Sequence, residues 1–243
     1  MVPSLIFIVP YRDREQQQHF FSTQMKTVLS DREPDTYKIL YIHQTDTRQF
    51  NRGAMKNIGF LVIKSMYPND FKDITMVFND VDTMPYTPGF LKYDTVRGVV
   101  KHFYGFKFAL GGIVSLTGYD FELTNGFPNF WGWGYEDNVL NSRVLKCGLK
   151  IDRTQFYPIL DKNILHLMDG FERIMNRTEK STYKNTDEGF DKISGLKYNL
   201  DEVSGFINVI TFDTQREENI ATTATHDLRD EFRNRQQMKM AFF

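Results

Sequence analysis

Two carboxylates stand directly after an apolar run of the chain, in the segment Asn79-Asp80-Val81-Asp82 that follows residues 74–78. If that run is a sheet strand, its carboxyl end can place one Asp on a divalent cation and the other on a neighbouring ligand group. Carboxylate oxygens suit Mg²⁺ or Mn²⁺, and these ions commonly bridge to phosphates. The alternative is a turn in which both Asp side chains bond to their own backbone.

Basic and aromatic side chains follow two other apolar runs. The apolar run at residues 5–9 is followed by Pro10-Tyr11-Arg12-Asp13-Arg14, where planar guanidinium groups can bond a diphosphate in a bidentate manner. The run at residues 38–43 is followed by Phe50-Asn51-Arg52. Here the Phe50 ring can stack on a nucleobase beside the cationic donor Arg52. The alternatives are a solvated helix start at Arg14 and a surface loop with a half-buried Phe50.

Both tryptophans of the chain lie in Trp131-Gly132-Trp133-Gly134-Tyr135-Glu136-Asp137-Asn138. Indoles between glycines make a mobile aromatic platform, and the C–H faces of sugars pack on such rings. Glu136 and Asp137 open a predicted helix, whose dipole favours ionised carboxylates. The alternative is that this acidic pair only caps the helix. The segment therefore predicts a sugar site or a helix cap.

The elements that position these residues alternate along the first half of the chain. We predict buried strands over residues 5–9, 38–43 and 74–78, because these runs are apolar and rich in β-branched residues. Helical spacing of apolar residues predicts helices over residues 14–29 and 53–66. This order predicts an α/β domain with a mostly parallel sheet, with its ligand site at the carboxyl ends of the strands.

The second half of the chain is less regular. We predict a helix from Glu136 to Cys147 that ends at Gly148, and a long exposed loop from Asp169 to Gly189. Residues 169–189 are polar, and loops of such length in compact domains are usually functional or disordered. The charged tail from Arg216 is predicted to be helical, without recognisable chemistry.

Composition excludes several classes of protein. With 30 basic and 31 acidic side chains, the net charge of -1 gives no general attraction to nucleic acid or to an anionic membrane. One cysteine, Cys147, excludes an internal disulfide framework. No apolar run is long enough for a transmembrane segment or a signal peptide. We therefore expect a single domain of 243 residues in a soluble, cytoplasmic protein.

Taken together, these segments resemble the β-1,4-galactosyltransferase family over about residues 5 to 213. The matching motifs are PYRDR at 10–14, FNR at 50–52, NIGF at 57–60, FNDVD at 78–82, GG at 111–112, NGFPNFWGWGYEDN at 125–138, a histidine at His166 and GFDKI at 189–193. The resemblance implies a GT-A fold, a Rossmann-like central sheet with flanking helices. It also implies a Mn²⁺ cofactor, with Mg²⁺ as an alternative, a UDP-sugar donor and inversion at the anomeric carbon.

The resemblance also implies roles for individual residues. The nucleotide-sugar site comprises Pro10, Tyr11, Arg12, Arg14, Phe50, Arg52, Asp80, Val81, Asp82, Gly112 and Trp133. In the catalytic pair, Asp137 matches the base and Glu136 a sugar-binding carboxylate. The implied acceptor residues are Tyr135, Glu136, Asp137, Asn138, Phe190 and Ile193. The implied metal ligands are Asp82, His166 and Met168.

The chain departs from the family pattern at several of these positions. The family completes its metal site with a His near a Met or with a His-x-His pair; this chain has His166 and Met168, and the thioether of Met168 is a soft, weak partner for Mn²⁺. Asn138 replaces a second Asp after the catalytic one, and Gly189 replaces an arginine of the acceptor pocket, so the acceptor stays open. Ala109 stands where galactose-specific members carry a bulky tyrosine, so UDP-GalNAc is a candidate donor beside UDP-galactose.

The sequence thus predicts a hexosyltransferase that moves galactose or GalNAc from a UDP-sugar to a saccharide or glycoconjugate hydroxyl. We expect one catalytic domain over 1–243, with a nucleotide-binding part at about 1–110, an acceptor-binding part at about 111–213 and a charged tail at 214–243. The alternatives are a non-catalytic sugar-binding module, a nucleotidyltransferase and a UDP-sugar hydrolase. A lectin would have no use for both a metal dyad and Asp137.

Overall fold

Three apolar runs of the chain form neighbouring parallel strands. In the computed structural model, which describes residues 1–229, β1 (Leu5–Tyr11) lies between β2 (Tyr37–Gln44) and β3 (Thr75–Asn79). All seven residues of β1 are buried, as a continuous apolar run predicts. Because the three strands are parallel, their carboxyl ends lie at one edge of the sheet. The predicted βαβ units are confirmed.

Further strands extend this sheet on both sides. Within the described residues it holds nine strands in the order β11-β12-β2-β1-β3-β6-β5-β7, with β8 paired to β5. The added strands are β5 (Val99–Gly105), β6 (Ile113–Thr117), β7 (Lys150–Asp152), β8 (Tyr157–Pro158), β11 (Ser194–Asp201) and β12 (Phe206–Asp213). β6 runs antiparallel to β3 and β5, whereas β12 runs parallel to β2. The predicted α/β class with a mostly parallel central sheet is confirmed.

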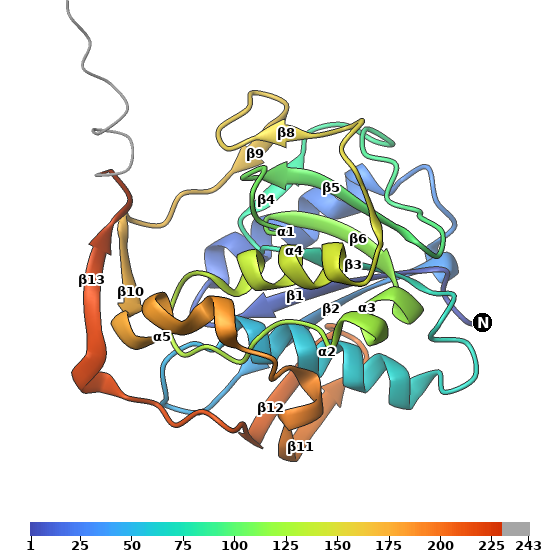
Figure 1. The fold of residues 1–243 in the computed structure, drawn as a ribbon. Coiled ribbons are helices and arrows are strands. Elements are labelled where there is room, and N and C mark those ends of the chain that lie inside the picture. Colours follow the sequence, from blue (N-terminus) through green and yellow to red (C-terminus); the bar gives the residue numbers. More distant parts are fainter. Residues whose placement is uncertain (230–243) are drawn as a thin grey trace, which may run out of the picture.

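Helices cover both faces of the sheet (Figure 1). On one face, α1 (Glu15–Val28) buries Phe21 and Met25 against the side chains of Phe7 and Val9. On the other face lie α2 (Arg52–Met66), α3 (Gly118–Thr124) and α4 (Glu136–Lys146), which pack on Ile6, Ile8 and their neighbours. Because side chains alternate along a strand, the apolar run of β1 supplies both layers of the core.

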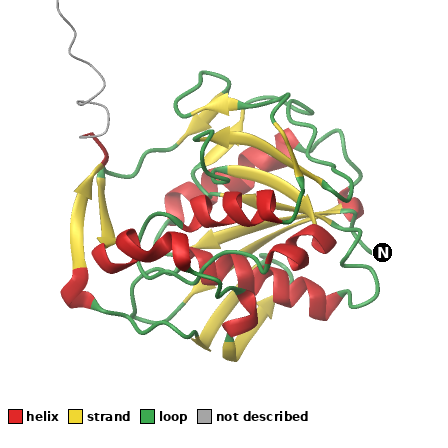
Figure 2. Cartoon of the chain, in the orientation of Figure 1, coloured by secondary structure: helices red, strands yellow, loops and turns green. Residues whose placement is uncertain are grey.

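Two short strand pairs stand outside the main sheet. β4 (Thr83–Pro85) pairs with β9 (Ile164–His166), and β10 (Glu172–Asn176) pairs with β13 (Thr223–Asp227), both antiparallel. Figure 2 shows the β10–β13 pair at one side of the molecule, next to α5 (Arg177–Thr182). Short 3-10 turns cover Pro34–Thr36, Tyr183–Asn185, Phe190–Lys192 and Ile220–Thr222.

Two predictions for the C-terminal part are wrong. The segment 169–189, expected as a loop, contains β10, α5 and a 3-10 turn. Residues 216–229 of the tail contain β13 in place of the predicted helix, and residues 230–243 lie outside the described residues. The partner of β10 lies far along the chain, so local sequence does not reveal the pairing. Across residues 1–229, no helix has the length and apolar character needed to cross a membrane.

Candidate active site

A cavity of about 630 Å³ lies at the carboxyl edge of β1, β2 and β3. It brings together residues that the sequence places in six separate segments. The predicted site residues that line it are Pro10, Arg12, Arg14, Phe50, Arg52, Asp80, Val81, Asp82, Gly112, Trp133, Tyr135, Glu136, Asp137, Asn138, His166 and Met168. Ala109 lines it as well. The sheet therefore gathers its polar strand ends into one site, as parallel topology predicts.

Three predicted residues do not line this cavity. Tyr11 is buried in the core, where its ring packs edge-on against His43 and Phe206. Phe190 packs on Phe60 with ring centroids 4.9 Å apart, and Ile193 lies against the same core cluster. These apolar side chains are drawn to the core because burial stabilises them. Phe190 and Ile193 therefore form no wall of the cavity, in contrast to the role that the sequence suggested for them.

Asp82 and His166 face each other across a strand pair. Thr83 of β4 is paired with His166 of β9, and the Leu167 amide donates to the Asp82 carbonyl at 2.8 Å. This pairing places the His166 Nε2 atom 3.9 Å from the Asp82 Oδ2 atom. The other ring nitrogen, Nδ1, lies 3.0 Å from the Tyr104 hydroxyl. Nε2 is thus the nitrogen that faces Asp82, the arrangement in which a second partner orients a metal-binding histidine.

The surroundings of Asp82 suit a cation. Burial raises the pKa of the Asp82 carboxyl, and the neighbouring charge of Asp80 raises it further, while His166 and Arg52 oppose the shift. A carboxylate and an imidazole nitrogen are both ligands that Mn²⁺ accepts. Met168, also in the cavity wall, would supply only a soft thioether. Across residues 1–229, no group of three or more His, Cys, Asp or Glu side chains forms a metal cluster.

Several guanidinium groups line the same cavity as Asp80 and Asp82. Arg14 forms an ion pair with Asp169 at 2.5 Å, and Arg52 lies over the Phe50 ring at 4.8 Å from its centroid. Burial lowers the pKa of Arg173, and the positive charges of Arg52 and Arg14 lower it further. This crowding of like charges favours an anion between them, and a diphosphate fits that requirement.

Asp137 lies at the start of α4, where the cavity meets the helix. Its main-chain carbonyl accepts from the Leu110 amide at 2.9 Å, and its Oδ1 atom lies 3.0 Å from Lys56 Nζ. Burial raises the pKa of Asp137 to about 7, against the opposing charge of Lys56. The neighbouring Glu136 is buried, and its Oε2 atom accepts from the Gly134 amide at 3.1 Å. A carboxyl with a pKa near 7 can accept a proton at neutral pH.

The two tryptophans have different surroundings. Trp131 is buried in the core and stacks on Phe212, with ring centroids 5.8 Å apart. Trp133 lines the cavity, stacks on His226 of β13 with centroids 5.9 Å apart, and donates its amide to the Ile174 carbonyl at 2.7 Å. Only Trp133 therefore belongs to the aromatic platform that the sequence suggested for both.

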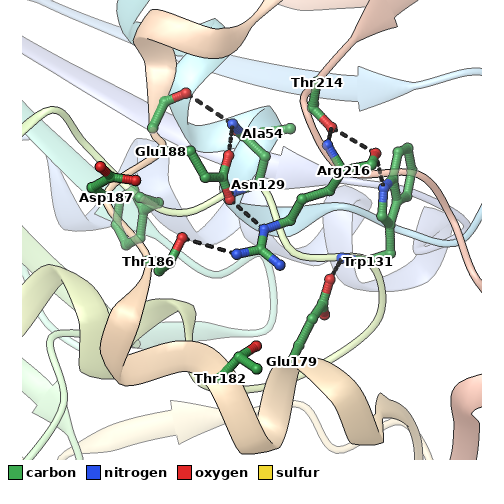
Figure 3. A network of polar contacts seen from close by, with 12 residues as sticks. Ala54, Asn129, Trp131, Glu179, Thr182, Thr186, Asp187, Glu188, Thr214 and Arg216 are labelled. Carbon is green, nitrogen blue, oxygen red and sulfur yellow. Dashed lines mark hydrogen bonds and ion pairs between the residues drawn. The ribbon is translucent and has the colours of Figure 1, made fainter.

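A buried polar network holds residues 129–131, which precede Trp133 of the cavity wall (Figure 3). The Glu188 carboxylate accepts from the Asn129 side chain at 2.7 Å and from Arg216 Nε at 2.6 Å. The Trp131 indole donates to the Arg216 carbonyl at 2.9 Å, and the Trp131 amide donates to Glu179 at 3.1 Å. Burial raises the pKa of Glu179 to about 7. These contacts join three distant parts of the chain and fix the position of the loop.

Comparison with known proteins identifies the family. Residues 3–89 match the family described as the N-terminal region of glycosyl transferase group 7, and residues 97–166 match the N-terminal domain of galactosyltransferase. The chain is 33% identical over 215 residues to the xylosylprotein 4-beta-galactosyltransferase of Caenorhabditis elegans, covering 84% of this chain and 70% of that relative. The chain belongs to the β-1,4-galactosyltransferase family. The predicted family and enzyme class, a hexosyltransferase, are thereby confirmed.

Other relatives agree with this assignment. Human β-1,4-galactosyltransferase 7 is 30% identical to this galactosyltransferase family member over 200 residues, covering 79% of this chain and 59% of the human protein. In structure, the chain resembles Drosophila β-1,4-galactosyltransferase 7, with a TM-score of 0.69, 20% identity and coverage of 89% and 96% of the two chains. That fly protein is a mutant in complex with manganese, UDP-Gal and xylobiose. This likeness confirms the predicted GT-A fold.

Three side chains at the site of this galactosyltransferase family member escaped the sequence analysis. Tyr104 contacts His166, Arg173 lines the cavity, and Lys56 contacts Asp137. Tyr104 and Arg173 reach the site through strand pairings that the sequence did not predict. The sequence does hold one indication for Lys56: it is a charged residue among the buried positions of α2, and a buried lysine usually has a charged partner.

Proposed function

We propose that this chain transfers galactose from UDP-galactose to a saccharide hydroxyl, with Mn²⁺ as cofactor and with inversion at the anomeric carbon. The observation that carries this proposal is that one cavity holds Asp82, His166 and Asp137. The complex of the fly relative with manganese, UDP-Gal and xylobiose supports the same donor and cofactor here. It also suggests xylosides as the first acceptors to test.

The metal would be held by Asp82 and His166, with Met168 as a third, weaker ligand. Mn²⁺ is the better candidate and Mg²⁺ the alternative, because an imidazole ligand is less suited to Mg²⁺. When bound, such a cation neutralises charge on the diphosphate as UDP departs. The Tyr104 hydroxyl would keep the His166 Nε2 atom directed at the site.

The donor would bind along the side of the cavity built mainly from residues 1–110. Arg12, Arg14 and Arg173, which line the cavity, would bond the diphosphate, while Phe50 and Arg52 would supply a ring and a donor for the uracil. By resemblance to the family, Asp80 would lie beside the ribose and Val81 would contact the donor, and Pro10 and Gly112 would complete that wall. Tyr11 would support this site from the core, without direct contact.

The acceptor would bind mainly on residues 111–213 of the same catalytic domain. Asp137 would take the proton from the attacking hydroxyl, and Glu136 would bind sugar hydroxyls beside it. Tyr135 and Asn138 offer further contacts at this end of the cavity. Trp133 would cover the donor sugar and exclude water, which otherwise competes with the acceptor as nucleophile.

Incubation with UDP-galactose, Mn²⁺ and a panel of xylosides and other saccharides tests the reaction class. We expect UDP release that requires both the metal and an acceptor, together with a galactosylated product in mass spectrometry. A sugar-binding module would release no UDP. A hydrolase would release UDP equally without acceptor, and a nucleotidyltransferase would release pyrophosphate.

The size of the donor pocket leads to a second prediction. The small side chain of Ala109, in the cavity wall, leaves space that a tyrosine would fill, so we propose that UDP-GalNAc is accepted as well as UDP-galactose. In donor competition, UDP-GalNAc is expected to inhibit galactose transfer and to yield its own product. Ala109→Tyr is expected to lose about fivefold or more in kcat/KM for UDP-GalNAc, because overpacking costs about 1 to 3 kcal/mol. Strict rejection of UDP-GalNAc by the unaltered protein would refute the idea.

A further inference from the structure

A buried lysine lies behind the proposed catalytic base. Lys56 belongs to α2, and its side chain is only 3% exposed. Its Nζ atom lies 3.0 Å from Asp137 Oδ1 and 4.6 Å from the centroid of the Phe127 ring. Asp137 lines the cavity, whereas Lys56 is not among the residues of its wall. The ammonium group therefore reaches the carboxylate from the protein side, where it leaves the cavity free for substrate.

This contact fixes the orientation of the carboxylate. One oxygen, Oδ1, is taken by Lys56, and the other, Oδ2, lies against Gly111, where an added Cβ would be only 2.1 Å away. Gly111 lines the cavity, so its missing side chain leaves room for the carboxylate at this point of the wall. Asp137 is thus held between a cation on one side and bare backbone on the other. Oδ2 is the oxygen left for a proton from the cavity.

The other charged groups near this pair are negative. Asp80 follows β3, and Glu136 precedes Asp137 on α4; both act on Asp137 and on Lys56. Burial together with two neighbouring carboxylates strengthens the hold of Asp137 on its proton, and Lys56 is the cation that opposes them. Burial alone would lower the pKa of Lys56, but the charges of Asp137, Asp80 and Glu136 more than offset this and raise it. The ammonium therefore stays protonated.

We infer that Lys56 is a positioning residue for the transfer reaction, which keeps part of the Asp137 population ionised at neutral pH and directs the Asp137 Oδ2 atom toward the acceptor hydroxyl. This inference rests on the proposed role of Asp137 as the base. Lys56 does not contact substrate; it acts through Asp137. Without the ammonium, Asp137 would retain its proton to higher pH and would be unable to accept another.

The pH dependence of kcat in Lys56→Met and Lys56→Gln tests this role. Met resembles Lys in length, and Gln keeps a polar end, while both remove the charge. In the unaltered protein, activity is expected to fall as the pH falls through about 7, because Asp137 becomes protonated. In each variant we expect this fall in activity to occur at least one pH unit higher, with at least a fivefold loss of kcat at pH 7 and recovery toward pH 9. KM for UDP-galactose is expected to change less than twofold.

The chain offers a matched control on the same helix. Lys64 also pairs with a carboxylate, Glu122, and also lies over a ring, that of Phe71, but it is 41% exposed and lies outside the cavity wall. Lys64→Met is expected to keep the pH profile of the unaltered protein. A loss of activity by the same factor at every pH in the Lys56 variants would show a merely structural role and overturn the inference. An unshifted profile would overturn it equally.

A measurement without substrate separates this inference from the proposed function. The carboxyl carbon of Asp137 can be followed by NMR during a pH titration and assigned by its absence in Asp137→Asn. We expect the Asp137 carboxyl to titrate near pH 7 in the unaltered protein and above pH 8 in the Lys56 variants, whether or not any acceptor is turned over.

If neither variant folds, titration of the unaltered protein still tests the inference. Titration of Asp137 near the ordinary pKa of an aspartate, or titration of Lys56 below pH 9, would refute it.

Discussion

Asp137→Asn is expected to lower kcat for galactose transfer by about a thousandfold while Mn²⁺-dependent UDP binding persists, since a positioned base contributes about 10²- to 10⁴-fold. The amide matches the carboxylate in shape but cannot take the proton of the acceptor hydroxyl. The Asp82–His166 pair that would hold the metal does not include Asp137, so nucleotide affinity should change little. Turnover of labelled UDP-galactose and calorimetry with UDP and Mn²⁺ measure the two effects.

The stability of Asp137→Asn provides an internal check. The substitution leaves the buried Lys56 ammonium without its ionised partner, so we also expect a lower melting temperature. Asp73→Asn is the control, because Asp73 forms an exposed ion pair with Arg97 and is remote from the proposed chemistry. Retention of transfer by a folded Asp137→Asn protein would assign the base to another residue.

Asp82→Asn is expected to abolish both nucleotide binding and transfer. The substitution removes the carboxylate that faces His166, and we expect Mn²⁺ affinity to fall by about a hundredfold or more. Loss of a residue that only supports a metal ligand already costs about 10- to 100-fold in metal affinity, and loss of a ligand should cost at least as much. UDP binding should fall with it, because the diphosphate would lose its principal counter-charge. Titration of free Mn²⁺ by electron paramagnetic resonance, followed by UDP calorimetry, measures the two losses in turn.

The contrast between the two variants separates metal binding from proton transfer. Asp137→Asn should bind UDP and fail to transfer, whereas Asp82→Asn should fail at both. Unchanged Mn²⁺ affinity in Asp82→Asn would place the cation elsewhere. Asp73→Asn again serves as the matched change of charge.

The parts of the fold that sequence analysis predicted well are those set by local patterns. The strands β1, β2 and β3 are apolar runs, and α1 and α2 show helical spacing, so their positions and parallel order followed directly. The placement of Asp82 and Arg12 at one edge followed from that order, and the cavity agrees with it. The parallel order of the strands thus made most of the proposed donor-binding part of the cavity predictable.

The remaining features depend on contacts between distant segments. β10 lies in a polar stretch and becomes a strand only by pairing with β13. Phe190 sits in a short motif that says nothing about whether its ring meets the core or the cavity. Lys56 is a charged residue among the buried positions of α2, but its partner Asp137 lies far along the chain, so local sequence does not reveal the pair. Sequence alone does not supply such tertiary information.

The contacts of Trp133 join the cavity wall to the C-terminal part of the described chain. Its amide donates to the Ile174 carbonyl of β10, and its ring lies on His226 of β13, so Trp133 is held by a strand pair formed from two remote segments. Rotation of the ring would break its stack on His226, and movement of the Trp133 backbone would break the bond to Ile174 or displace the β10–β13 pair with it. The position of the Trp133 ring in the cavity wall is therefore coupled to β13, the last strand among the described residues.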